Sequence, residues 1–167
     1  VERDEAGRPL RMVGTCVDVT EEKRSAVALA DAGERYRTMF TENRSVMFTV
    51  DPDSGRIVDA NSAAQEFYGY DREVLQDMNI TDLNVLPPEE VHRQMTQARE
   101  RHRNHFRFRH RLASGEVRDV EVFSGPMRLH HGTLLYSIIH DVTDRVRAEQ
   151  ALERALERYR ILFQGVS

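Results

Sequence analysis

The chain has 167 residues, of which 40% are hydrophobic and 31% are charged, and its formal net charge is −4. This balance is typical of a globular domain and excludes an intrinsically disordered chain, and no apolar run approaches the roughly 18 residues of a membrane-spanning helix. The negative charge argues against bulk attraction to nucleic acid, while the single Cys16 excludes an internal disulfide and a cysteine-rich zinc site and favours a reducing cytoplasm.

An internal repeat relates two distant parts of the chain. Twelve of the 23 residues in Asp18–Phe40 recur without a gap in Asp141–Phe163, at a constant offset of 123 residues. A fixed offset of this kind indicates tandem units. We therefore predict the terminal strand region of a preceding unit at residues 1–20, a linker helix at 21–40, one complete unit at 41–143, and a C-terminal linker helix with the start of a following unit at 144–167.

The first elements are a strand, a helix and two further strands. Met12–Val19 is rich in β-forming residues and predicts the strand that closes the preceding unit. The apolar spacing of Glu21–Phe40 predicts a helix, which Gly33 interrupts or bends. Ser45–Val50 and Arg56–Ala60 then read as strands, because the residues between them form a turn.

Short helices and one longer helix follow in the sequence. Asn61 is a natural N-cap, and Gly69 supplies the stop of the helix that it starts. Arg72–Gln76 and Ile80–Asn84 are predicted to be single helical turns. Pro87 opens a longer helix that runs to about Arg101, with acidic residues at its start and basic ones at its end.

Three strands and a closing helix complete the predicted order, which is that of an α+β domain. Short turns separate the strands, and the helix carries an apolar stripe wide enough for a parallel partner helix. The predicted ranges are Arg103–Leu112, Glu116–Arg128 and Thr133–Val142 for the strands and Asp144–Phe163 for the helix.

Four sequence segments carry a resemblance to a known family: Val58–Ala64, Phe67–Glu73, Arg109–Glu116 and His140–Arg145. Through them the region Glu34–Arg147 resembles a PAS domain of bacterial signalling proteins. The resemblance implies a five-stranded antiparallel sheet with short helices and one longer helix on one face, flanked by N- and C-terminal amphipathic linker helices. It also implies a cavity between sheet and helices, where family members hold heme, flavin or small metabolites. The flanking helices of the family usually form dimers and pass signals to a histidine kinase or a cyclic-di-GMP enzyme.

The candidate ligand pocket consists of side chains expected to face this cavity. In the strand Arg103–Leu112, alternation places Phe106, Phe108 and His110 on the cavity side. His110 is either a ligand-binding group or a core histidine bonded to backbone, and we favour the second because buried imidazoles usually find a backbone partner. The candidates are Phe48, Val50, Phe67, Met95, Phe106, Phe108, His110, Val120, Val122 and Ile138.

The cofactor and metal signals are weaker. His92 lies on the longer helix where heme-binding relatives carry a ligand, but beside the apolar stripe and not at its centre, so a rim position is preferred. Asp77–Asp82 contains no cysteine, which excludes covalent flavin photochemistry and leaves non-covalent flavin open. His102 and His105 lack an acidic or thiolate companion at ligand spacing, so no zinc site is expected.

Asp141 and Thr143 are the candidate signal relay. Both side chains can accept hydrogen bonds from free N–H groups at the start of the final helix. Such bonds would couple the last strand to that helix.

These observations predict a non-catalytic sensory and dimerisation module of a signalling protein, cytoplasmic, with any membrane attachment of the parent protein lying upstream. The expected partners are a second copy paired through the flanking helices, adjacent PAS units and an output domain. The segment itself is expected to contact neither nucleic acid nor membrane.

A heme- or flavin-binding redox or gas sensor is the alternative. A hydrolase is disfavoured because the sequence has no nucleophile-elbow serine. Nucleic-acid binding through the basic run Arg93–Arg111 is disfavoured by the net charge.

Overall fold

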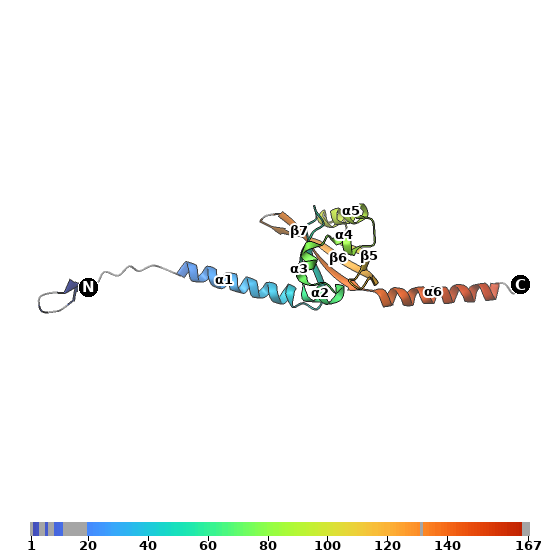
Figure 1. The fold of residues 1–167 in the computed structure, drawn as a ribbon, viewed down its shortest axis with the longest axis horizontal. Coiled ribbons are helices and arrows are strands. Elements are labelled where there is room, and N and C mark those ends of the chain that lie inside the picture. Colours follow the sequence, from blue (N-terminus) through green and yellow to red (C-terminus); the bar gives the residue numbers. More distant parts are fainter. Residues whose placement is uncertain (1, 4–5, 7–8, 12–19, 131, 165–167) are drawn as a thin grey trace. The chain divides into compact units, whose positions relative to one another are not determined.

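The structure is a computed structural model that describes residues 2–3, 6, 9–11, 20–130 and 132–164 (Figure 1). The chain divides into two compact units, Val1–Tyr36 and Arg37–Ser167. In the first unit, β1 (Glu2–Arg3) and β2 (Pro9–Arg11) pair antiparallel. The strand predicted at Met12–Val19 lies outside the described residues.

Helix α1 (Thr20–Tyr36) continues through Gly33, so of the interruption or bend predicted there, the interruption is wrong. Glu21 and Glu22 in its first turn and Arg35 in its last turn favour the helix through its dipole. Glycine costs a helix about 1 kcal/mol relative to alanine, and the surrounding alanines offset that cost. The backbone changes only afterwards, in the π-helical turn η1 (Arg37–Thr41).

The second unit is built on a five-stranded antiparallel sheet with strand order β4-β3-β7-β6-β5. Four helices pack on it between β4 and β5 in sequence, and α6 follows β7 (Figure 1). The predicted fold class is confirmed, and the predicted strand and helix bounds agree to within about two residues. The strands are β3 (Val46–Val50), β4 (Ile57–Ala60), β5 (His105–Arg111), β6 (Val117–Leu129) and β7 (Gly132–Asp141); the helices are α2 (Ser62–Tyr68), α3 (Arg72–Asp77), α4 (Ile80–Leu83), α5 (Pro88–Arg99) and α6 (Thr143–Gln164).

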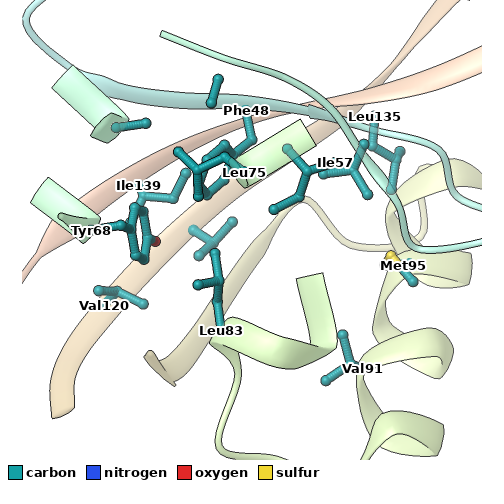
Figure 2. Packing of buried hydrophobic residues seen from close by; sticks show 14 of the residues in the cluster. Phe48, Ile57, Tyr68, Leu75, Leu83, Val91, Met95, Val120, Leu135 and Ile139 are labelled. Carbon is teal, nitrogen blue, oxygen red and sulfur yellow. The ribbon is translucent and has the colours of Figure 1, made fainter. Parts of the chain in front are cut away.

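The core fills the space between the sheet and these helices (Figure 2). Phe48 and Ile57 enter it from the sheet, and Tyr68, Leu75 and Leu83 enter from α2, α3 and α4; all five are 0% exposed. Each of these three helices therefore contributes a fully buried side chain, which holds it against the sheet through the hydrophobic effect.

Asn61 joins three parts of this unit and is 1% exposed. Its amide nitrogen Nδ2 lies 3.1 Å from the carbonyl of Phe40, 3.1 Å from that of Asn43 and 2.7 Å from that of Ser45. Its Oδ1 accepts from the backbone N–H groups of Met47 and Ala64, each at 3.0 Å. The predicted N-cap is confirmed, and the same side chain also fastens η1 to β3.

Helix α6 leaves the sheet with an exposed apolar stripe. Leu152, Leu156, Tyr159 and Phe163 are 60–65% exposed, and their spacings of four, three and four residues place them on one side. No helix in the described part of the chain is long and apolar enough to cross a membrane.

Candidate functional site

A cavity of about 50 Å³ lies between the sheet and the helices α4 and α5. Its walls are mostly apolar, and the polar side chains among them are Asn84, Gln94, His110, Ser124 and Ser137. The lining residues are Phe48, Val50, Ile80, Asn84, Val91, Gln94, Met95, Ala98, Phe106, Phe108, His110, Val122, Ser124, Leu135, Ser137 and Ile139.

Seven of the ten residues predicted for the pocket line this cavity. They are Phe48, Val50, Met95, Phe106, Phe108, His110 and Val122. The alternation read from the sequence of β5 is correct, since its buried positions are Phe106 and His110 while Arg107, Arg109 and Arg111 are exposed.

The other three predicted residues lie elsewhere. Phe67 packs edge-on against Tyr68 with ring centroids 4.9 Å apart, and Val120 is buried in the core away from the cavity wall. Ile138 lies on the opposite face of β7, beside Phe123 and Tyr136. Successive strand residues point to opposite faces, so its neighbour Ile139 takes the cavity position.

A pair of serines on the sheet was not predicted. Ser124 of β6 and Ser137 of β7 stand opposite each other, and their buried hydroxyl oxygens are 3.0 Å apart. Their position in the strand alternation could have revealed them. Ser124 lies two residues after Val122, and Ser137 lies two residues from both Leu135 and Ile139, so both serines share the face of these apolar residues. A small hydroxyl in such a position lies inside the core and needs a partner there.

His110 is buried and is bonded to side chains, so the expectation of a backbone partner for its ring is wrong. Its Nδ1 lies 2.7 Å from the hydroxyl of Tyr68, and its Nε2 lies 3.4 Å from Nδ2 of Asn84. Burial lowers the pKa of His110 to about 3, so the ring is neutral at physiological pH. Burial, followed by the nearby charge of Asp141, raises the pKa of the Tyr68 phenol and keeps it protonated.

Neither cofactor expected as an alternative fits these residues. His92 does not line the cavity, and its Nδ1 lies 2.7 Å from the carbonyl of Pro88 on the preceding turn of its own helix. His92 thus lies on the helix where the resemblance puts a heme ligand, but it does not line the cavity. A volume of about 50 Å³ is far below the roughly 300 Å³ of pockets for drug-sized ligands, so a flavin ring does not fit either.

Metal-binding residues do not gather in the described part of the chain, where no group of three His, Cys, Asp or Glu side chains can hold an ion. His102 instead lies 3.3 Å from Glu100, and the ring of His105 stacks on Phe123 with centroids 4.5 Å apart.

The predicted relay residues lie where β6, β7 and α6 meet. Oγ1 of Thr143 accepts from the backbone N–H of Asp119 on β6 at 3.0 Å and donates to Oδ1 of Asp141 on β7 at 2.5 Å. The same Asp141 oxygen accepts from the backbone N–H of Thr143 at 2.9 Å, as predicted for a helix start. Thr143 itself accepts from a strand and not from a helix N–H, which differs from the expectation.

An ion pair not predicted from the sequence adds a second link between sheet and helix. Arg145 of α6 lies 2.6 Å from Oε1 of Glu121 on β6, and Arg107 of β5 lies 3.0 Å from the same oxygen. The hydrogen bond from Arg145, together with Arg107, lowers the pKa of Glu121 below its ordinary value, so the carboxylate is charged. The first turn of α6 is thus bonded to the sheet by a hydroxyl and by a guanidinium.

The geometry of cavity and exit helix agrees with the comparisons with known proteins. The family model described as PAS domain matches residues 45–144, from the start of β3 to the start of α6. The chain belongs to the PAS domain family. The matched residues of this PAS domain contain every residue that lines the cavity and both relay residues.

A diguanylate cyclase is among the relatives of this PAS domain. The diguanylate cyclase DgcM of Escherichia coli (strain K12) is 33% identical over 123 residues, which cover 72% of this chain and 30% of that protein. The chain therefore spans less than a third of the length of this curated relative.

Solved PAS domains share the fold. The PAS domain of an HTR-like protein from Haloarcula marismortui is 21% identical and has a TM-score of 0.64, covering 71% of this chain and 98% of that one. A domain of the sensory box sensor histidine kinase/response regulator from Geobacter sulfurreducens is 18% identical, with a TM-score of 0.52 and coverage of 66% and 95%. At these identities the likeness shows the fold alone.

Proposed function

We propose that this PAS domain is a non-catalytic sensory and dimerisation module of a bacterial signal-transduction protein. A small molecule or a partner changes the arrangement of the sheet, and Asp141 and Thr143 pass that change to α6. The helix pairs with α6 of a second copy and carries the change to an output domain.

The observation that carries this proposal is the position of the Thr143 hydroxyl. It accepts from β6 at Asp119 and donates to β7 at Asp141, while its own backbone begins α6. A hydroxyl has only one hydrogen, so while that hydrogen is donated to Asp141 it is not available to another acceptor. A relative displacement of β6 and β7 must therefore move the start of α6 or break one of these bonds.

The strands that hold Thr143 also line the cavity. Val122 of β6 and Ile139 of β7 face each other in register and both contact the cavity, three residues from Asp119 and two from Asp141 respectively. A ligand in the cavity would therefore push on β6 and β7 close to the residues that hold Thr143. A ligand shifts the arrangement only to the extent that it binds one arrangement more tightly than the other.

The apolar stripe of α6 supports pairing with a second copy. Leu152, Leu156, Tyr159 and Phe163 alternate at spacings of four and three residues, which is the seam spacing of a parallel coiled coil. These side chains are more than half exposed. Burying a leucine or an aromatic side chain contributes roughly 1.5–3 kcal/mol, so a paired seam is favoured over an exposed one.

The relative DgcM supports a cyclic-di-GMP enzyme as the output, because that protein is a diguanylate cyclase. The likeness to a sensor histidine kinase is a likeness of fold, so a kinase output has weaker support. The repeat of Asp18–Phe40 at Asp141–Phe163 supports adjacent PAS units in the same protein.

Native mass spectrometry of the freshly purified chain tests the proposal, with the variant Ala98→Leu as comparison. Ala98 lines the cavity and is 2% exposed, so a leucine there occupies the cavity. The wild-type chain is expected to carry the mass of a small molecule and to give a dimer, and Ala98→Leu is expected to lose only the small molecule. A bare chain in both samples would contradict ligand binding, and a monomer in both would contradict the dimer.

A further inference from the structure

Two nitrogen atoms face each other at the polar end of the cavity. Asn84, which ends α4, and His110 of β5 form an antiparallel bridge, supported by the backbone bond from Val85 N–H to the carbonyl of Arg109 at 2.9 Å. This bridge brings Nδ2 of Asn84 within 3.4 Å of Nε2 of His110. Both side chains line the cavity.

The orientation of the Asn84 amide is fixed by its other end. Its Oδ1 accepts from the backbone N–H of Leu86 at 3.0 Å. The NH₂ group is therefore the part of the amide that faces His110, and it can only donate.

The described residues leave one buried hydrogen without an acceptor, whichever ring nitrogen of neutral His110 carries the proton. If Nδ1 carries it, Nδ1–H donates to the Tyr68 oxygen 2.7 Å away, and the phenol hydrogen has no acceptor among the described residues. If Nε2 carries it, the phenol donates to Nδ1, but Nε2–H then faces the NH₂ group of Asn84. Two donors 3.4 Å apart do not bond each other, although both can donate to one oxygen that lies beside them at hydrogen-bond distance from each nitrogen.

The charge of the cavity restricts what that atom belongs to. None of the residues that line it is Asp, Glu, Lys or Arg. The lowered pKa of His110 leaves the imidazole uncharged, so a carboxylate or phosphate in this cavity would have no counter-charge. Apart from the uncharged polar side chains of Gln94, Ser124 and Ser137, the remaining walls are phenylalanine, aliphatic and methionine side chains, which suit an apolar body.

We infer that the ligand is a small uncharged carbonyl compound whose oxygen accepts from Nδ2 of Asn84 and from Nε2 of His110. This inference rests on the proposed binding of a small molecule in the cavity. The bound carbonyl fixes the Nε2–H form of the ring and leaves Tyr68 as the donor to Nδ1, so the ring N–H, the phenol O–H and one N–H of Asn84 each have an acceptor. The volume of about 50 Å³ limits the compound to a few heavy atoms unless α5 moves.

Two probes of the same ring size test the inference: cyclopentanone, which has the carbonyl oxygen, and cyclopentane, which lacks it. Each probe is titrated into the chain labelled with nitrogen-15, and the changes in the NMR shifts of the backbone amides give its dissociation constant. Cyclopentanone is expected to bind about tenfold more tightly, as for a ligand that satisfies a buried donor. The nitrogen shifts of the His110 ring are expected to report the Nε2–H form when cyclopentanone is bound.

Two variants locate the effect. His110→Phe keeps a ring and removes the N–H donor, so the two probes should then bind equally. Val50→Ala changes the apolar wall and should leave the preference for cyclopentanone intact. The titration of the wild-type chain and its ring shifts need no variant, so a failure of His110→Phe to fold does not remove the test.

Equal affinity of the wild-type chain for both probes would overturn the carbonyl inference and leave the cavity as a binding site. Binding of cyclopentanone with His110 in the Nδ1–H form would also overturn it. Binding of neither probe would count against both the inference and the proposed ligand binding.

Discussion

The hydroxyl of Tyr68 lies 2.7 Å from Nδ1 of His110, although the two residues are 42 positions apart in the chain. Tyr68 ends α2 and His110 lies in β5, and their side chains are 0% and 2% exposed. This hydrogen bond crosses the core and joins α2 to β5, an edge strand of the sheet.

Replacing Tyr68 by phenylalanine should destabilise the fold by about 1–3 kcal/mol, because it leaves the buried Nδ1 of His110 without its partner. The ring contacts with Phe48 and Phe67, at centroid distances of 5.1 and 4.9 Å, are retained. Urea unfolding measures the change. Tyr70→Phe is the matched control: Tyr70 is only partly buried, its hydroxyl makes no hydrogen bond within the described residues, and its loss should change stability by less than about 0.5 kcal/mol.

The free energy of unfolding should decrease as the pH is lowered from about 6.5 to 5, because His110 is buried in its neutral form. The pKa of His110 is lowered from 6.5 to about 3, so over this range the unfolded chain binds a proton that the folded chain does not. The contribution is complete above the unfolded pKa and decreases as pH falls, with a slope of up to about 1.4 kcal/mol per pH unit. Urea unfolding at several pH values measures it.

The control for this pH dependence is His110→Phe, in which the slope between pH 6.5 and 5 should flatten. The lowered pKa values of Asp51, Glu90 and Glu121 add losses of the same sign, but they act below their ordinary values of 3.8, 4.5 and 4.5. An unchanged slope in His110→Phe would show that other groups are responsible.

Asn61→Asp should destabilise the fold by on the order of 3 kcal/mol. Aspartate keeps the oxygen that caps α2, but it replaces the Nδ2 donor by an oxygen that faces the carbonyls of Phe40, Asn43 and Ser45. Thermal and urea unfolding measure the loss. Asn43→Asp makes the same chemical change at an exposed amide whose Nδ2 bonds only the carbonyl of Met39, and it should cost less than about 1 kcal/mol.

Thr143→Val should release the start of α6 from the sheet while keeping the shape of the side chain. Valine cannot accept from Asp119 N–H or donate to Asp141, so amide exchange at Val146, which donates to the carbonyl of Val142, should accelerate. Hydrogen exchange measured residue by residue tests this. Thr133→Val, on β7 and away from α6, should leave exchange in α6 unchanged; equal acceleration in both variants would mean general destabilisation and not release of the helix.

Leu156→Glu should convert a dimer into monomers, since it places a charge in the proposed seam of α6. Sedimentation equilibrium over a range of concentrations measures the change. Arg158→Glu also puts an acidic residue on α6, but two positions further along and therefore on the opposite side of the helix, so the dimer should persist. Loss of the dimer in both variants would argue against a seam at Leu156.

Local signals were enough to predict the order of the elements in the second unit. Four local features each fix a boundary by backbone chemistry and lie where expected: the turn at 51–55, the cap Asn61, the stop Gly69 and the prolines at the start of α5. The phase of β7 was harder to read. Ile138 and Ile139 are both apolar, so alternation does not show which faces the cavity, and the wrong one was chosen.

The polar contacts of the site could not be predicted from local patterns. Tyr68, Asn84 and His110 come from three separate elements, and only the register of the sheet and the packing of α2 and α4 bring them together. The partners of Ser124 and Glu121 likewise depend on which strand residues face each other. Pairing over such distances in sequence has no signature in a single chain, whereas caps and turns do.

Helix α6 continues for 22 residues from the anchored Thr143. The direction in which side chains at its far end point is therefore set by how the Thr143 hydroxyl is held at its start. Each residue inserted within the helix turns everything beyond it by about 100° and moves it 1.5 Å further along the axis. Under the proposed relay, an effector fused to this helix should respond to the cavity with a sign that alternates with linker length, repeating about every seven residues.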